Sequence, residues 1–133
     1  MVHRMLDLGR MRAAAQPLIG DHDFSAFRSA ICQAHSTRRQ LTELSVAAHG
    51  EWLVIQVTAN SFLHHMVRNL AGLLIDAGLG KLDAVAARAI LEGRDRRLAP
   101  PTAPAHGLYF WQVDYPAAFD LPVDRSAIIA PWL

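Results

Sequence analysis

Two apolar runs separated by a three-residue turn limit most strongly what this chain can fold into. Residues 41–48 alternate between apolar and polar side chains, with Leu44 and Val46 on one side, which predicts a strand with one buried face. Residues 49–51 form a turn, and residues 52–58 predict a second strand, apolar enough to be buried on both faces. Strands joined by so short a connection pair as antiparallel neighbours.

Helices are expected before and after this hairpin in the sequence. Apolar residues recur near helical spacing over residues 6–18 and over residues 60–77, and glycines follow both segments. A further helix is expected over residues 83–93, with its first residue as the cap. The proline-rich residues 100–104 then lead to a third strand over residues 108–113. The pattern predicts an α+β fold: an antiparallel sheet of at least three strands with helices packed on one face.

Composition bounds the class of protein. A chain of 133 residues fits one domain, and 52% hydrophobic residues argue against disorder. No apolar run approaches the roughly 20 residues of a membrane helix. The amino terminus lacks the apolar core of a signal peptide, and a single cysteine, Cys32, suits a reducing compartment. We therefore expect a cytoplasmic protein without a membrane partner.

The charge balance gives little guidance on its own. A net charge of +1 is small for a protein that binds nucleic acid chiefly by neutralising phosphates. Lys81 is the only lysine, so nearly all positively charged residues are arginines. An arginine can donate two hydrogen bonds to one phosphate in a bidentate geometry, which lysine cannot do. A high-GC genome would produce the same arginine bias, so both explanations stay open.

Polar side chains collect on one arc of the helix expected over residues 60–77. His64, His65, Arg68 and Asn69 lie near its N-terminal end, where free backbone N–H groups and the helix dipole favour anions. Such an end suits a phosphate or a carboxylate; the alternative is the solvated face of an ordinary amphipathic helix. Adjacent helical histidines point about 100° apart and do not share one ion, so we expect no metal site.

Three segments resemble motifs of the tRNA pseudouridine synthase A family, in family order and at family spacing. Residues 62–72 (FLHHMVRNLAG) resemble the signature helix. Residues 23–33, with DFSAFR and then CQ, resemble the start of the family's C-terminal domain, and residues 101–116 resemble its closing strand. The resemblance implies a pseudouridine synthase C-terminal domain over residues 1–122, followed by a tail of unknown role over residues 123–133.

The resemblance also implies an activity. Members of that family isomerise uridine to pseudouridine in the anticodon stem-loop of tRNA, as intramolecular transferases that need no metal or organic cofactor. They act as homodimers, and the target base leaves its stack for a pocket. The family's catalytic Asp lies in an N-terminal domain whose motif is absent here, so no Asp of this chain is assigned that role.

Two roles of the family map onto this half. Arg68 matches the arginine that pairs with the catalytic Asp; a guanidinium beside a carboxylate keeps it ionised and fixes its direction. Leu108 matches the apolar residue that begins the last strand and forms a wall of the base pocket. Considered alone, Leu108 is expected to be a core residue.

Further residues are assigned to RNA binding. His64, His65 and Asn69 are expected to support the site or face tRNA. Short arginine runs are expected to contact tRNA phosphates, or else to lie in solvated loops: Arg38 and Arg39, and Arg94, Arg96 and Arg97.

Three interpretations of the chain remain open. It is the C-terminal half of an active synthase whose N-terminal catalytic domain is missing here. Alternatively, it is a non-catalytic remnant that binds tRNA or another subunit. In the third interpretation it acts only as a dimerisation module.

Overall fold

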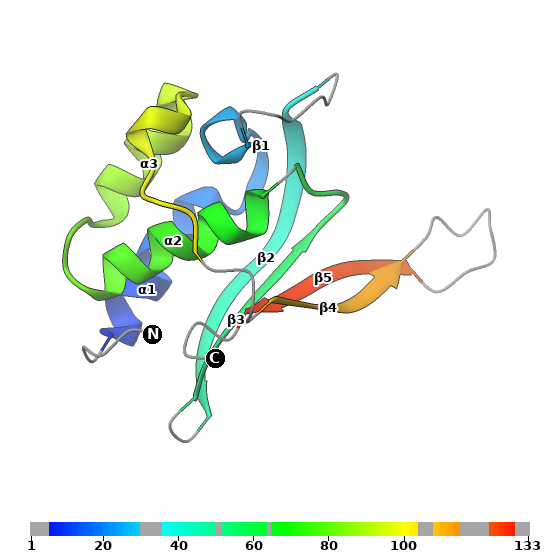
Figure 1. Ribbon diagram of the computed structural model, residues 1–133, viewed down its shortest axis with the longest axis horizontal. Helices are drawn as coiled ribbons and strands as arrows, with labels where there is room; N and C mark the ends of the chain where they lie inside the picture. The colour runs from blue at the N-terminus through cyan, green and yellow to red at the C-terminus, as the bar shows by residue number, and fades with distance from the viewer. Residues whose placement is uncertain are drawn as a thin grey trace.

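The computed structural model describes residues 6–29, 36–49, 52–63, 65–103, 108–114 and 123–129. One antiparallel sheet has the strand order β1-β2-β3-β5-β4, with bounds Gly20–Asp23 (β1), Arg38–His49 (β2), Trp52–Ala59 (β3), Leu108–Asp114 (β4) and Val123–Ile129 (β5). The helices are α1 (Leu8–Ala15), α2 (Met66–Gly78) and α3 (Ala84–Gly93). They lie on one side of β2 and β3 (Figure 1), which confirms the predicted α+β fold.

The β2–β3 hairpin forms the base of the core, with the antiparallel pairing that the sequence predicted. Its register pairs Leu44 with Val57 and Val46 with Ile55, and all four side chains are buried. Alternate residues of β3, such as Gln56, are only half-buried. The prediction that this strand is buried on both faces is therefore wrong: one face packs under the helices and the other partly reaches solvent.

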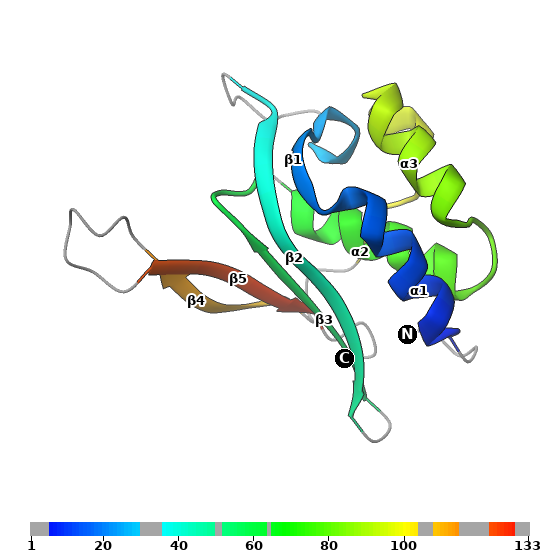
Figure 2. The same ribbon diagram turned by 180° about the vertical axis from the view of Figure 1, so that it is seen from behind.

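The helical layer is tied together and to the sheet by α1, which packs against α2, α3 and β2 (Figure 2). Arg12 Nε donates to the Val46 carbonyl at 2.9 Å and joins this helix to the sheet. Met11 is fully buried; complete burial of such a side chain contributes about 1.5–3 kcal/mol. As predicted, Asp83 caps α3, accepting from the Ala86 amide at 2.8 Å.

Three short 3-10 turns, η1 (Gln16–Leu18), η2 (Ser25–Phe27) and η3 (Arg96–Leu98), complete the helical layer. The sequence prediction missed strand β1, which follows η1 and pairs with the start of β2. Its residues carry no apolar alternation, so only the long-range pairing defines it.

Strand β5 is an internal strand of the sheet. Ala127 pairs with Val57 of β3 on one side and with Phe110 of β4 on the other. Residues 123–129, expected to belong to a tail of unknown role, thus connect the hairpin to β4. The β4–β5 ribbon extends away from the helical layer in both views (Figures 1 and 2).

Helix α2 begins later than predicted. Its first residue is Met66, and His65 before it adopts the left-handed conformation at φ 62°. Asn60, the first residue of the expected helix, instead closes the end of β3: its Oδ1 accepts from the Gln40 amide at 2.9 Å and from the Ser61 amide at 3.0 Å. In the described ranges no helix is long and apolar enough to cross a membrane.

Candidate functional site

Arg68 lies in the first turn of α2 and is bonded twice to one distant residue. Its Nε donates to the Ala103 carbonyl at 2.8 Å, and the Ala103 amide donates to the Arg68 carbonyl at 3.1 Å. Side chain and backbone are therefore held together against the segment that leads to β4. A guanidinium carries five N–H donors in a fixed plane, so fixing Nε also fixes the direction of the two terminal nitrogens.

His65 lies beside this guanidinium. Its Nε2 is 3.3 Å from Arg68 Nη1, and its side chain is exposed. A left-handed backbone at a non-glycine residue costs of order 1–3 kcal/mol and tends to occur at functional sites. His65 thus begins the helix in a conformation that places the ring next to Arg68. His64 lies outside the described residues.

Asn69 is buried, with 1% of its surface exposed, and it joins three segments. Its Nδ2 donates to the Phe27 carbonyl at 2.7 Å. Its Oδ1 accepts from Thr102 Oγ1 at 2.5 Å and from Arg96 Nη2 at 3.2 Å. The expectation that Asn69 faces tRNA gains no support, because both polar atoms of its side chain form hydrogen bonds inside the domain.

Gly72 allows residues 99–103 to cross close to α2. A Cβ at this position would lie 2.2 Å from the Pro101 carbonyl oxygen, far inside contact distance. The alternative interpretation of the polar arc of this helix was a solvated face. The arc is instead covered at Asn69 and Gly72, because both residues are buried. At the N-terminal end of the arc, His65 is exposed and Arg68 is partly open to solvent.

Leu108 is the first residue of β4, with Ile129 of β5 as its Cα partner. It follows Ala103 by five residues, a span of at most about 18 Å even when fully extended. The chain connectivity therefore limits how far Leu108 can lie from Ala103, which is bonded to Arg68.

The arginines assigned to RNA binding at the start of β2 lie at the surface. Arg38 is exposed and pairs with Asp21, Nε to Oδ1, at 3.1 Å. Arg39 Nη1 donates to the Ser36 carbonyl at 2.8 Å and to the Arg38 carbonyl at 2.7 Å. Both arginines therefore stabilise the start of β2, in addition to any contact with a ligand.

The second arginine group lies around η3. Arg97 forms a two-pronged pair with Asp95, with Nη2 2.8 Å from Oδ2. Hydrogen bonds from Arg97 lower the pKa of Asp95, and the same contact raises the pKa of Arg97. Arg94 ends α3 in the left-handed conformation, and its Nε lies 3.9 Å from Asp23 Oδ2.

Asp23 accepts hydrogen bonds from the Ser25 amide and from the Ser25 and Thr37 hydroxyls. Burial raises the pKa of Asp23, but hydrogen bonds from Ser25 and Thr37, together with the charge of Arg94, outweigh it and leave the pKa below its usual value. The carboxylate of Asp23 is thereby kept charged, and its hydrogen bonds link β1, η2 and the start of β2. Within the described part of the chain, no group of three or more His, Cys, Asp and Glu residues is placed to hold a metal ion.

Sequence comparison assigns the chain to a family. The family described as tRNA pseudouridine synthase matches residues 14–116, most of the chain and all of the Arg68 site up to Leu108. The chain is a member of the tRNA pseudouridine synthase family.

Relatives within this family carry the name tRNA pseudouridine synthase A. The chain is 48% identical to the Pseudomonas aeruginosa protein over 120 residues, which is 90% of this chain and 42% of that protein. Identity to the Bordetella avium protein is 48% over 129 residues, 96% of this chain and 48% of the relative. The Alcanivorax borkumensis protein is 50% identical over 120 residues, or 90% and 45% of the two chains. The chain thus spans less than half the length of these pseudouridine synthases.

Sequence reasoning missed the residues that hold the family's signature helix in place. Ala103 and Thr102 carry no motif of their own, and Arg96 was expected only as part of a short arginine run. Their role in holding α2 appears only in their hydrogen bonds to Arg68 and Asn69. The one available signal was the position of the first two inside a segment that resembles the family. Nothing in that resemblance indicated hydrogen bonds to α2.

Proposed function

We propose that this chain is the C-terminal domain of an enzyme that isomerises uridine to pseudouridine in the anticodon stem-loop of tRNA. Membership of the tRNA pseudouridine synthase family supports the reaction type. The observation that carries the proposal is Arg68, fixed at the start of α2 by both hydrogen bonds to Ala103.

In this proposal Arg68 pairs with a catalytic carboxylate supplied by the other half of the enzyme. A guanidinium within about 4–6 Å lowers a carboxylate pKa by roughly 1–3 units and so keeps it charged. Because Nε is bound to Ala103, the terminal nitrogens have one preferred direction in which to meet that carboxylate. His65 at 3.3 Å from Nη1 restricts the guanidinium further.

Leu108 has the second proposed role, as an apolar wall against the target uracil. A base that leaves its stack costs a few kcal/mol, and a pocket wall offsets part of this cost.

We place the remaining proposed tRNA contacts on His64, His65, Arg38, Arg39, Arg94 and Arg97. The proposal includes a cytoplasmic homodimer, and sedimentation at the monomer mass would contradict the dimer.

The test uses tRNA that carries tritium at C5 of uracil, because pseudouridine formation releases that label. The chain is assayed alone and joined to the N-terminal portion of the Pseudomonas aeruginosa relative, which this chain does not cover. We expect release from the joined protein and none from the chain alone. Release by the chain alone would show that one of its own carboxylates is catalytic. Absence of release from both would favour the alternative, a non-catalytic tRNA-binding or dimerisation module.

A further inference from the structure

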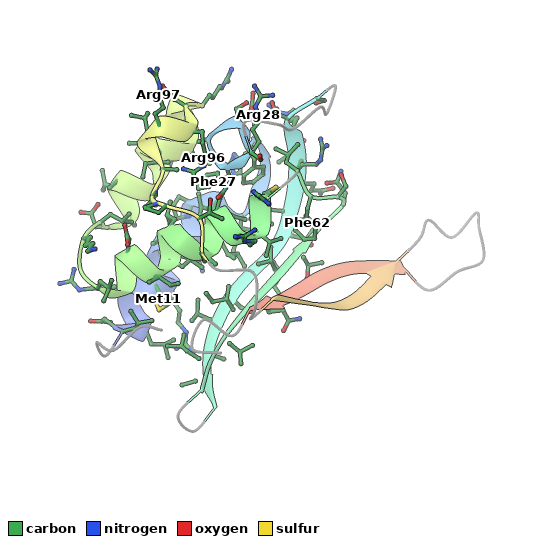
Figure 3. All side chains as sticks on the ribbon, viewed as in Figure 1. Met11, Phe27, Arg28, Phe62, Arg96 and Arg97 are labelled. Atoms are coloured by element: carbon green, nitrogen blue, oxygen red, sulfur yellow. The ribbon has the colours of Figure 1, made fainter. Side chains whose placement is uncertain are left out.

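We propose that a cavity of about 500 Å³ beside η2 and η3 binds one backbone phosphate of the RNA substrate. Its wall includes Arg28, Arg94, Arg96 and Arg97. The labelled Arg28, Arg96 and Arg97 gather at one end of the molecule in Figure 3, and the turns η2 and η3 contact each other. The inference rests on the proposed function, because it takes the anion to be part of an RNA.

The charge of this cavity is unusual for the chain. Four arginines and one carboxylate, that of Asp95, give a formal charge of +3, whereas the whole chain carries +1. A neighbouring cavity of about 450 Å³ is lined by three arginines and three carboxylates and is formally neutral. Positive charge is therefore concentrated at the first cavity and is balanced at the second.

Two of the four arginines have no carboxylate partner among the described residues. Arg28 is exposed, and Arg96 is partly buried. Arg96 is also fixed in place: Nη1 donates to the Ala99 carbonyl at 3.1 Å, and Nη2 donates to Asn69 and Thr102. A fixed guanidinium next to an exposed one suits an anion with several acceptor oxygens, because each arginine can offer N–H groups to a different oxygen.

The exposure of the outer arginines indicates an anion that belongs to a larger body. The Arg97 side chain is 89% exposed, so this side of the cavity is open to solvent. A phosphodiester fits this geometry because the RNA chain continues on both sides of it. The inner wall, Arg96, bonds to Asn69, which follows Arg68 in α2, so one network holds both the proposed phosphate site and the proposed catalytic partner.

The test measures tRNA affinity of the full chain as a function of salt. The variant Arg28→Gln/Arg97→Gln removes two exposed charges and leaves the Asn69 network intact. The matched control Arg10→Gln/Arg88→Gln removes two exposed arginines that form ion pairs outside the basic cavity. Affinities are taken between about 50 and 200 mM KCl, where phosphate contacts dominate the salt dependence. Equal thermal midpoints establish that all three proteins are folded.

We expect the cavity variant to bind tRNA roughly tenfold more weakly at 0.1 M salt, with a log–log salt slope smaller by about 1, the value for one lost phosphate contact. The control should match the parent. An unchanged slope in the cavity variant, equal losses in both variants, or no tRNA binding by the parent would overturn the inference.

A second arm separates RNA from free phosphate. Inorganic phosphate is titrated against the tRNA complex at constant ionic strength, and we expect no release at millimolar concentration. Inorganic phosphate that binds the parent but not the variant, and leaves tRNA bound to the parent, would assign the cavity to free phosphate and overturn the RNA assignment. Failure of the proposed function is distinguishable, because it would abolish tritium release by the joined protein while leaving the salt slopes as predicted.

Discussion

Asn69 shows how one buried amide organises a surface site. It receives hydrogen bonds from Arg96 and Thr102, donates one to the Phe27 carbonyl, and lies next to Arg68 in α2. A buried polar group left without its partner costs about 1–3 kcal/mol. The amide therefore links the stability of the domain to the position of the proposed catalytic partner.

We predict that Asn69→Ala lowers the free energy of unfolding by about 3 kcal/mol, because it strands a carbonyl and part of a guanidinium. The measurement is urea unfolding. Asn60→Ala is the matched control: Asn60 also accepts two backbone N–H groups but is exposed, so its loss should cost less than about 1 kcal/mol. Similar costs for the two variants would show that the buried network contributes nothing beyond ordinary hydrogen bonds.

Asp23 gives a prediction for the pH dependence of stability. Its pKa is below the unfolded value, so the ionised carboxylate stabilises the fold above about pH 4 and this stabilisation is lost as the pH falls through the folded pKa. We expect Asp23→Asn to be about 1 kcal/mol less stable than the parent at pH 7. The difference should shrink below about pH 4.

Chemical denaturation at a series of pH values checks this prediction. Asp21→Asn, on the same strand but exposed, serves as the control and should change stability by less than about 0.5 kcal/mol. A difference for Asp23→Asn that grows on acidification would have the wrong sign for a lowered pKa.

At the scale of elements, the decisive contact is the crossing of residues 99–103 over α2. Gly72 makes it possible, since a Cβ there would lie 2.2 Å from the Pro101 carbonyl oxygen. The crossing brings Thr102 to Asn69 and Ala103 to Arg68. The position of Arg68 therefore depends both on α2 and on residues 99–103.

We predict that Gly72→Ala destabilises the domain by about 1–3 kcal/mol, because the clash is with backbone and outweighs the gain in helix propensity of roughly 1 kcal/mol. The control is Gly93→Ala, where the new Cβ would meet only the end of the exposed Leu98 side chain. This control should be neutral or slightly stabilising. Thermal unfolding decides: a Gly72→Ala protein as stable as the parent would contradict the close crossing.

The elements defined by local pattern could be predicted from the sequence, whereas those defined by distant partners could not. The β2–β3 hairpin and the cap of α3 at Asp83 follow from alternation and capping chemistry. The start of α2 could not be predicted, because apolar Phe62 continues the helical period although the chain turns at His65. Strand β1 has no period of its own, and its pairing with β2 forms it.

The candidate site was predictable in a similar way. Resemblance placed Arg68 at the signature helix, and the structure adds how Ala103 fixes it. Asn69 was expected at the surface because helical periodicity does not show what covers the opposite arc. Asn69 is covered by Thr102, which lies 33 residues later in the sequence, and by Phe27, which lies 42 residues earlier.

At the scale of the whole molecule, the chain spans less than half the length of its relatives. We propose that its site is one wall of a larger one. Arg68 fits this proposal, because it is held in position by a hydrogen bond to Ala103 while the carboxylate that it is proposed to pair with is not assigned to any residue of this chain. We propose that Arg68 acts in the chemical step and not in RNA binding.

Arg68→Ala in the joined protein tests this claim most directly, with tritium release and tRNA affinity measured on the same preparation and Arg88→Ala as the control. We predict a loss of turnover of at least about 10²-fold, the scale of removing one electrostatic partner from an active site, with tRNA affinity nearly unchanged. An equal loss of turnover and affinity would contradict the account and make Arg68 a phosphate contact.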